Sequence, residues 1–176
     1  LIEDLLTFSQ IEQQEDLFIA TDLNLIVKET LSDLEQAIEQ KSARIIVGQL
    51  PEISARPTQM RQLFQNLIAN ALKFNDKAIP EIQITSDIVP ERTHGAPDKY
   101  YCRIYVQDNG IGFDEQYIEK IFTLFQRLHT RAAYEGTGIG LALCRKIVEE
   151  HNGSITAESV PGERTTFIVT LPMNRN

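Results

Sequence analysis

The stretches DNGIG at residues 108–112 and GTGIGL at residues 136–141 decide the fold of this chain, and the second runs directly into a helical pattern. Glycine has no Cβ, so its backbone turns sharply and its N–H groups can come close to a ligand. Where such a loop opens a helix, unpaired N–H groups and the positive end of the helix dipole meet, and this favours a phosphate group. A tight turn explains one glycine cluster alone. Two clusters, one of them leading into a helix, favour a nucleotide.

A line of polar side chains on an earlier helix points to the same ligand. Pro57 suits the first position of this helix, and its apolar positions follow the spacing i, i+3, i+4: Met60, Leu63, Phe64, Leu67, Ile68, Ala71 and Leu72. Away from this face, Asn66, Asn70 and Lys73 are spaced i, i+4, i+7 and therefore form one line. Amide oxygens can hold Mg²⁺ together with substrate phosphates, and a lysine adds positive charge. The alternative is a solvated polar face, which most amphipathic helices carry.

Helical and extended patterns alternate along the rest of the chain. Helices are predicted over residues 1–14, 22–41, 115–122 and 138–151, the second with Asp22 as its N-cap. Strands are predicted over residues 16–20, 44–50, 81–89, 101–108, 154–160 and 165–171. The pattern breaks down over residues 123–135, which predicts a mobile segment between the two glycine boxes. This order predicts an α+β fold, a two-layer sandwich with a mixed, mostly antiparallel sheet packed on helices.

Composition excludes several classes of protein. The chain of 176 residues carries 17 basic and 25 acidic residues, a net charge of −8, which argues against nucleic acid as a partner. Since no apolar run is long enough to cross a bilayer and there is no secretory start, we expect a cytoplasmic location without direct membrane contact. Cys102 and Cys144 lack metal-binding spacing and are expected to be buried, reduced thiols. The three histidines are too far apart in sequence to suggest a metal site.

Four boxes in this chain resemble those of the catalytic and ATP-binding domain of bacterial sensor histidine kinases, which belong with gyrase, chaperone and mismatch-repair ATPases. QLFQNLIANALKF resembles the N box, DNGIGF the first glycine box, IFTLFQRL the F box and GTGIGLAL the second glycine box. The stretch EGTGIGLALCRKIVEEH is similar to kinases of the phytochrome and hybrid-sensor type. The resemblance implies the Bergerat ATP-binding fold over residues 16–176. It also implies that residues 1–15 form the end of a dimerisation helix, of which most is absent.

The resemblance implies a role for each residue near the N box and at the start of the first glycine box. Asn70 would bind Mg²⁺, and Asn66 would assist directly or through water. Lys73 would contact phosphate. Phe74 would pack against adenine, although it can equally be plain core. Asp108 would accept the hydrogen of the adenine amino group, although a carboxylate there can also cap a turn.

The remaining implied roles belong to the glycine boxes and the F box. Gly110 and Gly112 would let the backbone pass the base, and Arg127 would steady the charge that develops on the γ-phosphoryl group. The residues that would line the phosphates and hinge the lid are Gly136, Thr137, Gly138 and Gly140. Thr137 has the alternative of capping the following helix. His151, at the end of that helix, is better placed for a favourable contact with the helix dipole than for accepting phosphate.

The residue types favour phosphoryl transfer over hydrolysis. Hydrolytic relatives place a glutamate base where Asn66 stands, and an amide cannot take a proton. Asn109, where gyrase-like chains often carry an acid, points the same way. The implied reaction uses ATP and Mg²⁺ to phosphorylate a histidine-bearing dimerisation domain of the same or a partner subunit, upstream of a response regulator. Because none of the histidines precedes the ATP domain on a helix, the chain alone is expected to bind ATP without autophosphorylating. The alternatives are an ATPase of the gyrase type and a non-catalytic module that senses ATP or docks a partner.

Overall fold

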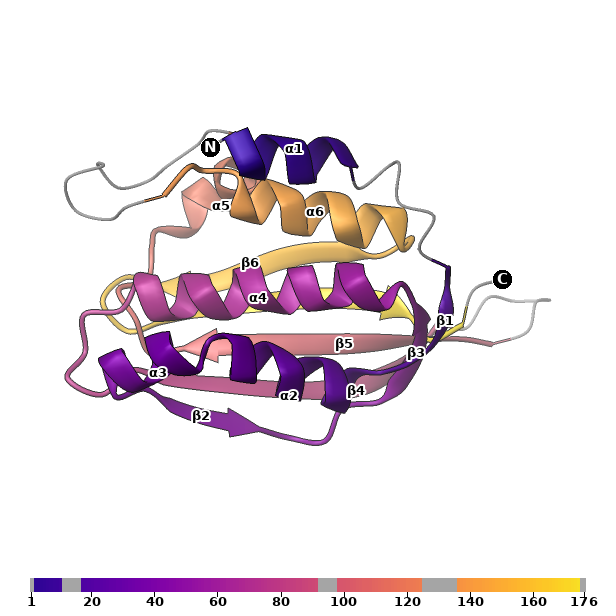
Figure 1. The fold of residues 1–176 in the computed structure, drawn as a ribbon, viewed down its shortest axis with the longest axis horizontal. Coiled ribbons are helices and arrows are strands. Elements are labelled where there is room, and N and C mark those ends of the chain that lie inside the picture. Colours follow the sequence, from indigo (N-terminus) through magenta and orange to yellow (C-terminus); the bar gives the residue numbers. More distant parts are fainter. Residues whose placement is uncertain (1, 11–16, 92–97, 125–135, 175–176) are drawn as a thin grey trace.

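A five-stranded sheet packed against a layer of helices forms the body of the molecule (Figure 1). The computed structural model describes residues 2–10, 17–91, 98–124 and 136–174. The order of the strands is β2 (Arg44–Val47), β4 (Glu81–Glu91), β5 (Lys99–Asp108), β7 (Arg164–Pro172) and β6 (Ser154–Val160). β2 runs parallel to β4, and the other neighbours are antiparallel. The predicted two-layer sandwich with a mixed, mostly antiparallel sheet is therefore confirmed.

The helical layer centres on α4 (Pro57–Lys73), which lies between α2 (Leu23–Asp33) and α6 (Gly140–Glu150) (Figure 1). The other described elements are α1 (Ile2–Gln10), α3 (Glu35–Lys41), the 3-10 turn η2 (Glu115–Tyr117), α5 (Ile118–Ile121) and a small antiparallel pair, β1 (Ile19–Asp22) with β3 (Glu52–Ala55). Because α4 contacts a helix on each side and the sheet beneath, it is the element from which the site is positioned.

The apolar face predicted for α4 is buried at every position: Met60, Leu63, Phe64, Leu67, Ile68, Ala71 and Leu72. It packs with inward-facing strand residues such as Ile82, Ile104 and Val169, which are fully buried. Each large apolar side chain buried in this way contributes roughly 1.5 to 3 kcal/mol. Pro57 takes the first helical position, as expected. The burial of one face fixes the rotation of α4, and so fixes where its polar line points.

The helix predicted over residues 22–41 is two helices. Asp22 caps the first, because its side chain accepts a hydrogen bond from the Asn24 N–H. The break falls at Leu34, whose φ of −97° and ψ of 6° are not helical. One turn earlier, the Thr30 hydroxyl donates to the Ile26 carbonyl over 2.8 Å. Such bonds from a side chain to the preceding turn often bend helices.

The strand predicted over residues 44–50 ends at Val47, and β3 was not predicted. The Asn24 amide explains the early end. Its Nδ2 donates to the Leu50 carbonyl over 2.6 Å, and its Oδ1 accepts from the Leu50 N–H over 2.8 Å. Leu50 therefore bonds to a side chain rather than to a strand.

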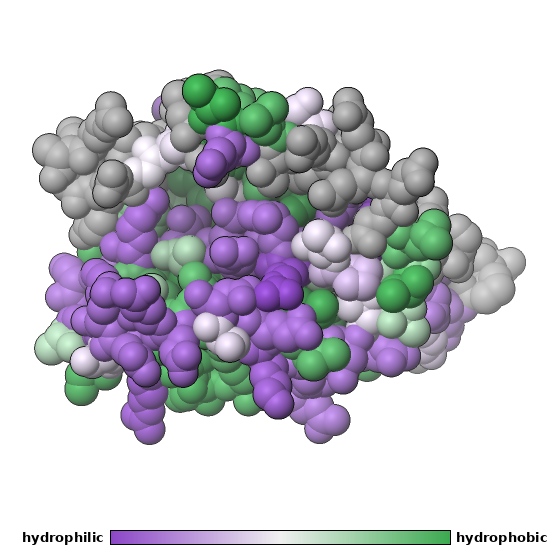
Figure 2. Space-filling model, viewed as in Figure 1, coloured by the Kyte–Doolittle hydropathy of each residue, from purple (hydrophilic) through white to green (hydrophobic). Residues whose placement is uncertain are grey.

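The described part of α1 exposes Ile2, Leu5 and Leu6, which form an apolar patch at the top of the view in Figure 2. This patch fits the expected end of a dimerisation helix. The division of the chain at residue 15 stays a prediction, since residues 11–16 lie outside the described part. In that part, no helix has both the length and the apolar character needed to cross a membrane.

Candidate functional site

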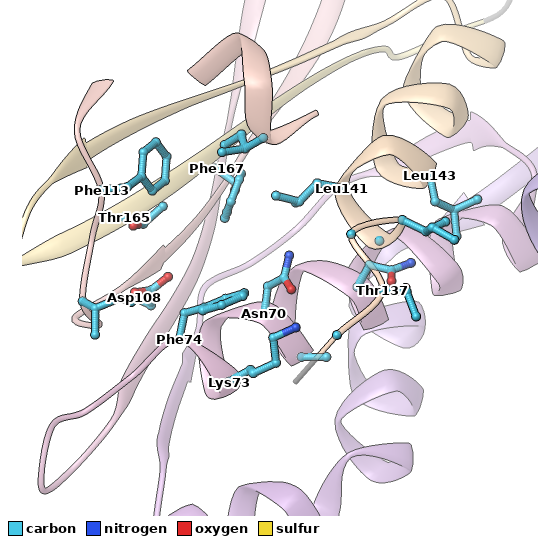
Figure 3. A pocket seen from close by; sticks show the side chains of 18 of the residues that line it. Asn70, Lys73, Phe74, Asp108, Phe113, Thr137, Leu141, Leu143, Thr165 and Phe167 are labelled. Carbon is cyan, nitrogen blue, oxygen red and sulfur yellow. The ribbon is translucent and has the colours of Figure 1, made fainter. Parts of the chain in front are cut away.

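A cavity of about 360 Å³ opens between the C-terminal half of α4, the first glycine box and the start of α6 (Figure 3). It brings together nearly all the residues predicted for the site: Asn66, Asn70, Lys73, Phe74, Asp108, Gly112, Gly136, Thr137, Gly138 and Gly140. Gly110 does not line the cavity but packs behind it. Arg127 and most of the predicted mobile segment lie outside the described residues. The convergence of an α4 polar line with two glycine boxes on one cavity is what the sequence predicts.

The amide of Asn66 has a defined orientation at one side of this cavity. Its Nδ2 donates to the Gln62 carbonyl one turn earlier, over 2.9 Å. Its Oδ1 points at the start of α6, 3.1 Å from the position that a Cβ on residue 140 would take. Gly140 therefore leaves room for Asn66. The bond to the helix backbone uses one of the two Nδ2 hydrogens and fixes the amide plane, so that Asn66 turns its acceptor oxygen toward the start of α6.

Asn70 and Lys73 continue the line, and both project toward the cavity (Figure 3). The Lys73 ammonium lies 4.5 Å from the centroid of the Phe74 ring. It also lies beside Gly136, where an added Cβ would come within 2.5 Å of Nζ. Lys73 thus reaches from α4 to the second glycine box and supplies a positive charge between the two.

Asp108 ends β5 and is only 6 % exposed. Its Oδ1 accepts a hydrogen bond from the Gly110 N–H over 2.8 Å, so Asp108 does cap the turn, which was the alternative to a contact with the base. The carboxyl group also lines the cavity. Burial raises its pKa from 3.8 to about 7, and the Gly110 hydrogen bond offsets only part of that rise. Asp108 is therefore poised to gain from a hydrogen-bond donor in the cavity.

The glycines of the first box are required by close packing. A Cβ on Gly110 would collide with the Phe74 carbonyl, and a Cβ on Gly112 would collide with the Val160 carbonyl. Gly112 also has a φ of +59°, which disfavours other residues. The Ile111 N–H donates to the Phe74 carbonyl over 3.0 Å. The box is thus held between the end of α4 and the β6–β7 turn.

Asn109 has a different place from the one that the sequence argument assumed. It is not among the residues that line the cavity. Its Oδ1 accepts from Asn75 Nδ2 over 2.9 Å and from the Glu81 N–H over 2.8 Å, and its Nδ2 donates to the Ile79 carbonyl over 3.2 Å. Asn109 ties the first glycine box to the loop after α4. Its identity therefore says nothing about hydrolysis, and that argument rests on Asn66 alone.

The second glycine box leads into α6 two residues later than predicted, at Gly140. Gly138 has a φ of +76°, and the N-cap is Ile139, without a capping hydrogen bond from its side chain. Thr137 is therefore not the cap, and it lines the cavity instead. A helix start without a side-chain cap leaves backbone N–H groups for an anion.

His151 is held in its neutral form by the backbone. The Arg56 N–H donates to Nε2 over 3.1 Å, so Nε2 carries no proton, and Nδ1 lies 2.8 Å from the Ile147 carbonyl and donates to it. The ring caps the last turn of α6, as its position suggested, but as a neutral donor. Being buried with both nitrogens engaged, it is not a phosphate acceptor. His94 and His129 lie outside the described residues.

The two cysteines are buried and unpaired with each other, as predicted. Burial raises the pKa of the Cys102 thiol to about 12, and burial also raises the pKa of Cys144. Within the described residues, no group of three His, Cys, Asp or Glu side chains could hold a metal ion. A metal in this part of the molecule would therefore depend on amide and phosphate oxygens.

The hydroxyl residues Thr165 and Ser159 were missed in the sequence, as were apolar lining residues such as Phe113 and Phe167. Thr165 lines the cavity and is the partner of Asp108 in the β5–β7 register. Ser159, on β6, contacts Thr165 from behind. The signal for Thr165 was present, because Phe167, Val169 and Leu171, at every second position of the same strand, face inward. Position 165 is a polar residue on that inward face.

Comparison with known proteins gives the class of the molecule. Residues 55–175 match the family of histidine kinase-, DNA gyrase B-, and HSP90-like ATPases, and the chain belongs to this family. Within that family, it is an ATP-binding catalytic domain of the sensor histidine kinase type. The resemblance of the four boxes to those of sensor histidine kinase catalytic domains is therefore confirmed.

The relatives in sequence are kinases and phytochromes. The chain is 44% identical over 173 residues to the phytochrome-like protein Cph1 of Synechocystis sp., which covers 98% of this chain and 22% of that protein. It is 42% identical to cyanobacterial phytochrome A of Nostoc sp., covering 98% and 21%. It is 32% identical over 179 residues to the sensor protein kinase WalK of Staphylococcus epidermidis, covering 98% and 28%. The chain therefore spans less than a third of the length of each.

Solved structures share the fold. The catalytic domain of the histidine kinase ThkA, in a nucleotide-free form, superposes with a TM-score of 0.70 at 28% identity, covering 89% of this chain and 96% of that one. Full-length ShkA in complex with AMPPNP superposes with a TM-score of 0.76 at 21% identity, covering 97% and 35%. The second likeness speaks for the fold alone.

Proposed function

We propose that the cavity binds Mg²⁺–ATP, and that the chain transfers the γ-phosphoryl group to a histidine on a dimerisation domain. The observation that carries this proposal is the convergence of Asn70, Lys73, Asp108 and the start of α6 on one cavity. Amide oxygens, an ammonium group, a buried carboxylate and a helix N-terminus are the groups that a metal-bound nucleotide needs, each at a different part of the ligand.

The adenine would lie at the end of the cavity that holds Asp108 and Phe74. Phe74 is half-buried and its ring faces the cavity, so it serves as a packing surface for the base rather than as plain core (Figure 3). Phe113 and Phe167 add apolar surface nearby. In its ionised form Asp108 would accept a hydrogen from the 6-amino group, which selects adenine over guanine because guanine carries an oxygen at that position.

The phosphates would lie at the other end, between Lys73 and the second glycine box. The N–H groups at the start of α6 and the Lys73 ammonium supply positive potential there. Asn70 and Asn66 would hold Mg²⁺ through their amide oxygens. The bond from Asn66 Nδ2 to the Gln62 carbonyl supports this role, because it directs the amide nitrogen toward the helix backbone and leaves the oxygen on the other side. When bound, the metal would neutralise charge on the phosphates. Arg127, by resemblance, would steady the transferred group.

Transfer is favoured over hydrolysis because the described lining lacks a base near the phosphates. Among the described residues that line the cavity, Asp108 is the only carboxylate and no histidine is present. Figure 3 shows Asp108 and Thr137 at opposite sides of the cavity, with Asn70 between them. A water molecule at the γ-phosphate would find no described proton acceptor, whereas a histidine side chain supplied by another domain brings its own nucleophile.

The partners and location follow from this reaction. The acceptor would be a histidine-bearing dimerisation domain of the same or a partner subunit, and a response regulator would receive the phosphoryl group afterwards. The use of ATP would place the domain in the cytoplasm.

The test combines three measurements on the purified chain. ATP titrations with and without Mg²⁺ measure binding, release of free phosphate measures hydrolysis, and γ-labelled ATP with a supplied histidine-bearing dimerisation domain measures transfer. We expect Mg²⁺-dependent binding, little phosphate release and label on the supplied domain that is lost in acid. Robust phosphate release by the chain alone would establish the ATPase alternative. Binding without transfer to any supplied domain would establish the non-catalytic module.

A further inference from the structure

Ser159 lies behind the base end of the cavity and is almost fully buried. Its hydroxyl has three neighbours at hydrogen-bonding distance. The Phe113 N–H donates to Oγ over 2.9 Å, Oγ donates to the Arg164 carbonyl over 3.0 Å, and Oγ lies 3.0 Å from Thr165 Oγ1. Ser159 therefore joins the end of the first glycine box to the hairpin that carries Thr165.

The direction of each proton in this group follows from the donors and acceptors. A hydroxyl has one proton and two lone pairs. A carbonyl can only accept, so the single proton of Ser159 is used on Arg164. A backbone N–H can only donate, so one lone pair is used by Phe113. The remaining lone pair faces Thr165, and Thr165 must therefore donate its own proton to Ser159.

Thr165 is thereby left as an acceptor on its other side. It lines the cavity and is paired with Asp108 across the β5–β7 ladder, so both side chains face the same end of the cavity (Figure 3). With its proton turned away, the Thr165 oxygen offers lone pairs beside a carboxylate that also accepts. A base with hydrogen-bond donors at this end is favoured, and a base with an oxygen there is disfavoured.

We propose that Ser159 is a positioning residue for nucleotide specificity: it turns the Thr165 proton away from the cavity, so that Thr165 accepts from the 6-amino group of adenine directly or through one water. This inference rests on the proposed placement of adenine beside Asp108. It assigns to the β6–β7 hairpin a part in reading the base, in addition to Asp108.

The test compares ATP with inosine triphosphate, which carries an oxygen in place of the 6-amino group and a proton on N1. The measured quantity is the dissociation constant of inosine triphosphate divided by that of ATP, both in the presence of Mg²⁺. In Ser159→Ala the Thr165 hydroxyl is free to rotate and donate to the 6-oxygen, so the ratio should fall about tenfold, the scale of one hydrogen bond. Thr156→Ala is the matched control, since Thr156 is exposed on the same strand, and it should leave the ratio unchanged.

The result distinguishes a role of Ser159 in nucleotide specificity from a purely structural role. Loss of the Phe113 hydrogen bond in Ser159→Ala weakens both nucleotides by the same factor, so an unchanged ratio would show that Ser159 is merely structural and would overturn the proposal. Thr165→Val provides a second measurement if Ser159→Ala fails to fold. It should lower the ratio likewise, and adding Ser159→Ala to it should change the ratio no further. A ratio unaffected by Thr165→Val also overturns the proposal, whereas failure of the wild type to bind ATP would instead overturn the proposed function.

Discussion

Replacing Asp108 by asparagine should make the stability of the nucleotide-free protein less dependent on pH. Asp108 is 6 % exposed, and burial raises its pKa from 3.8 to about 7. Between these two values the folded protein binds a proton that the unfolded chain does not. The free energy of unfolding therefore falls as the pH rises through this window, because the folded state must then either hold a buried charge or keep a proton that solvent no longer favours.

The size of the effect follows from the two pKa values. The contribution of Asp108 is present at acid pH and is lost as the pH rises through about 7. Between about pH 5.5 and pH 8 the loss amounts to about 2 kcal/mol, since one unit of pKa difference corresponds to about 1.4 kcal/mol. For a domain of this length, that is a difference of roughly 4 to 8 °C in Tm. Asp108→Asn removes the titrating group, so the Tm of this variant should fall less between about pH 5.5 and pH 8 than the Tm of the wild type, by about this amount.

The assay is thermal unfolding at a series of pH values for the wild type and two variants. Asp76→Asn is the control, because Asp76 is an exposed carboxylate in the loop after α4. The Asp76→Asn profile should follow the wild type, and the Asp108→Asn profile should rise relative to both between about pH 4 and pH 7 and then run parallel to them. If all three profiles run parallel, Asp108 does not titrate in this window and the argument from burial is wrong.

The same group links ATP binding to protons. The adenine amino group donates to the ionised carboxylate, so ATP should drive a proton off Asp108, and the affinity of the wild type should fall up to about tenfold for each pH unit below about 7. Calorimetric titrations in buffers with different ionisation enthalpies would measure the released proton. Asp108→Asn should release none and should bind ATP and GTP with more similar affinities.

Three further outcomes are expected. Asn70→Asp should keep the Tm within about 2 °C but change Mg²⁺-dependent ATP affinity at least about tenfold, because ligand charge and geometry change; calorimetry with Mg²⁺ present and absent checks this, and wild-type affinity would contradict the role. Gly112→Ala should lower stability by at least about 1 kcal/mol, since its φ of +59° is strained for alanine and the Val160 carbonyl fills the space; urea unfolding measures it, and an unchanged midpoint would contradict it. Cys102 and Cys144 should resist a thiol reagent near neutral pH until denaturant is added, because burial removes access and raises both pKa values.

The parts of the fold that could be predicted are those with a long local signal. α4 is 17 residues long and repeats its apolar spacing from Met60 to Leu72, and every predicted core position on it is buried. β3 has only four residues and pairs with β1, at least 30 positions earlier, so its stability depends on a contact that the local pattern does not contain. The break at Leu34 follows one turn after a hydroxyl bond from Thr30 to the helix backbone, a type of bond that often bends helices. Short elements and bends are decided by individual tertiary or side-chain bonds.

The same division holds for the site. The polar line on α4 and the glycine boxes were found because their spacing is fixed within one element. Asn109 was misjudged because its bonds reach Asn75 and Ile79 on the loop after α4 and Glu81 at the start of β4, which only the fold brings near. Ser159 was missed because its partners lie on the glycine box and at the start of the next strand.

The cavity has two ends that are built in different ways, and this explains which of its residues a sequence reveals. The proposed phosphate end consists of a helix start and side chains spaced along α4, so short sequence motifs are enough to reveal its residues. The base end is built on the sheet, where Asp108 and Thr165 are held opposite each other by the β5–β7 ladder. The ladder sets the backbone positions of both residues, and with the proposed placement of adenine the base end would discriminate by the direction of a proton. Such discrimination would depend on which neighbour takes each hydrogen, a property of the folded network that no single stretch of the chain contains.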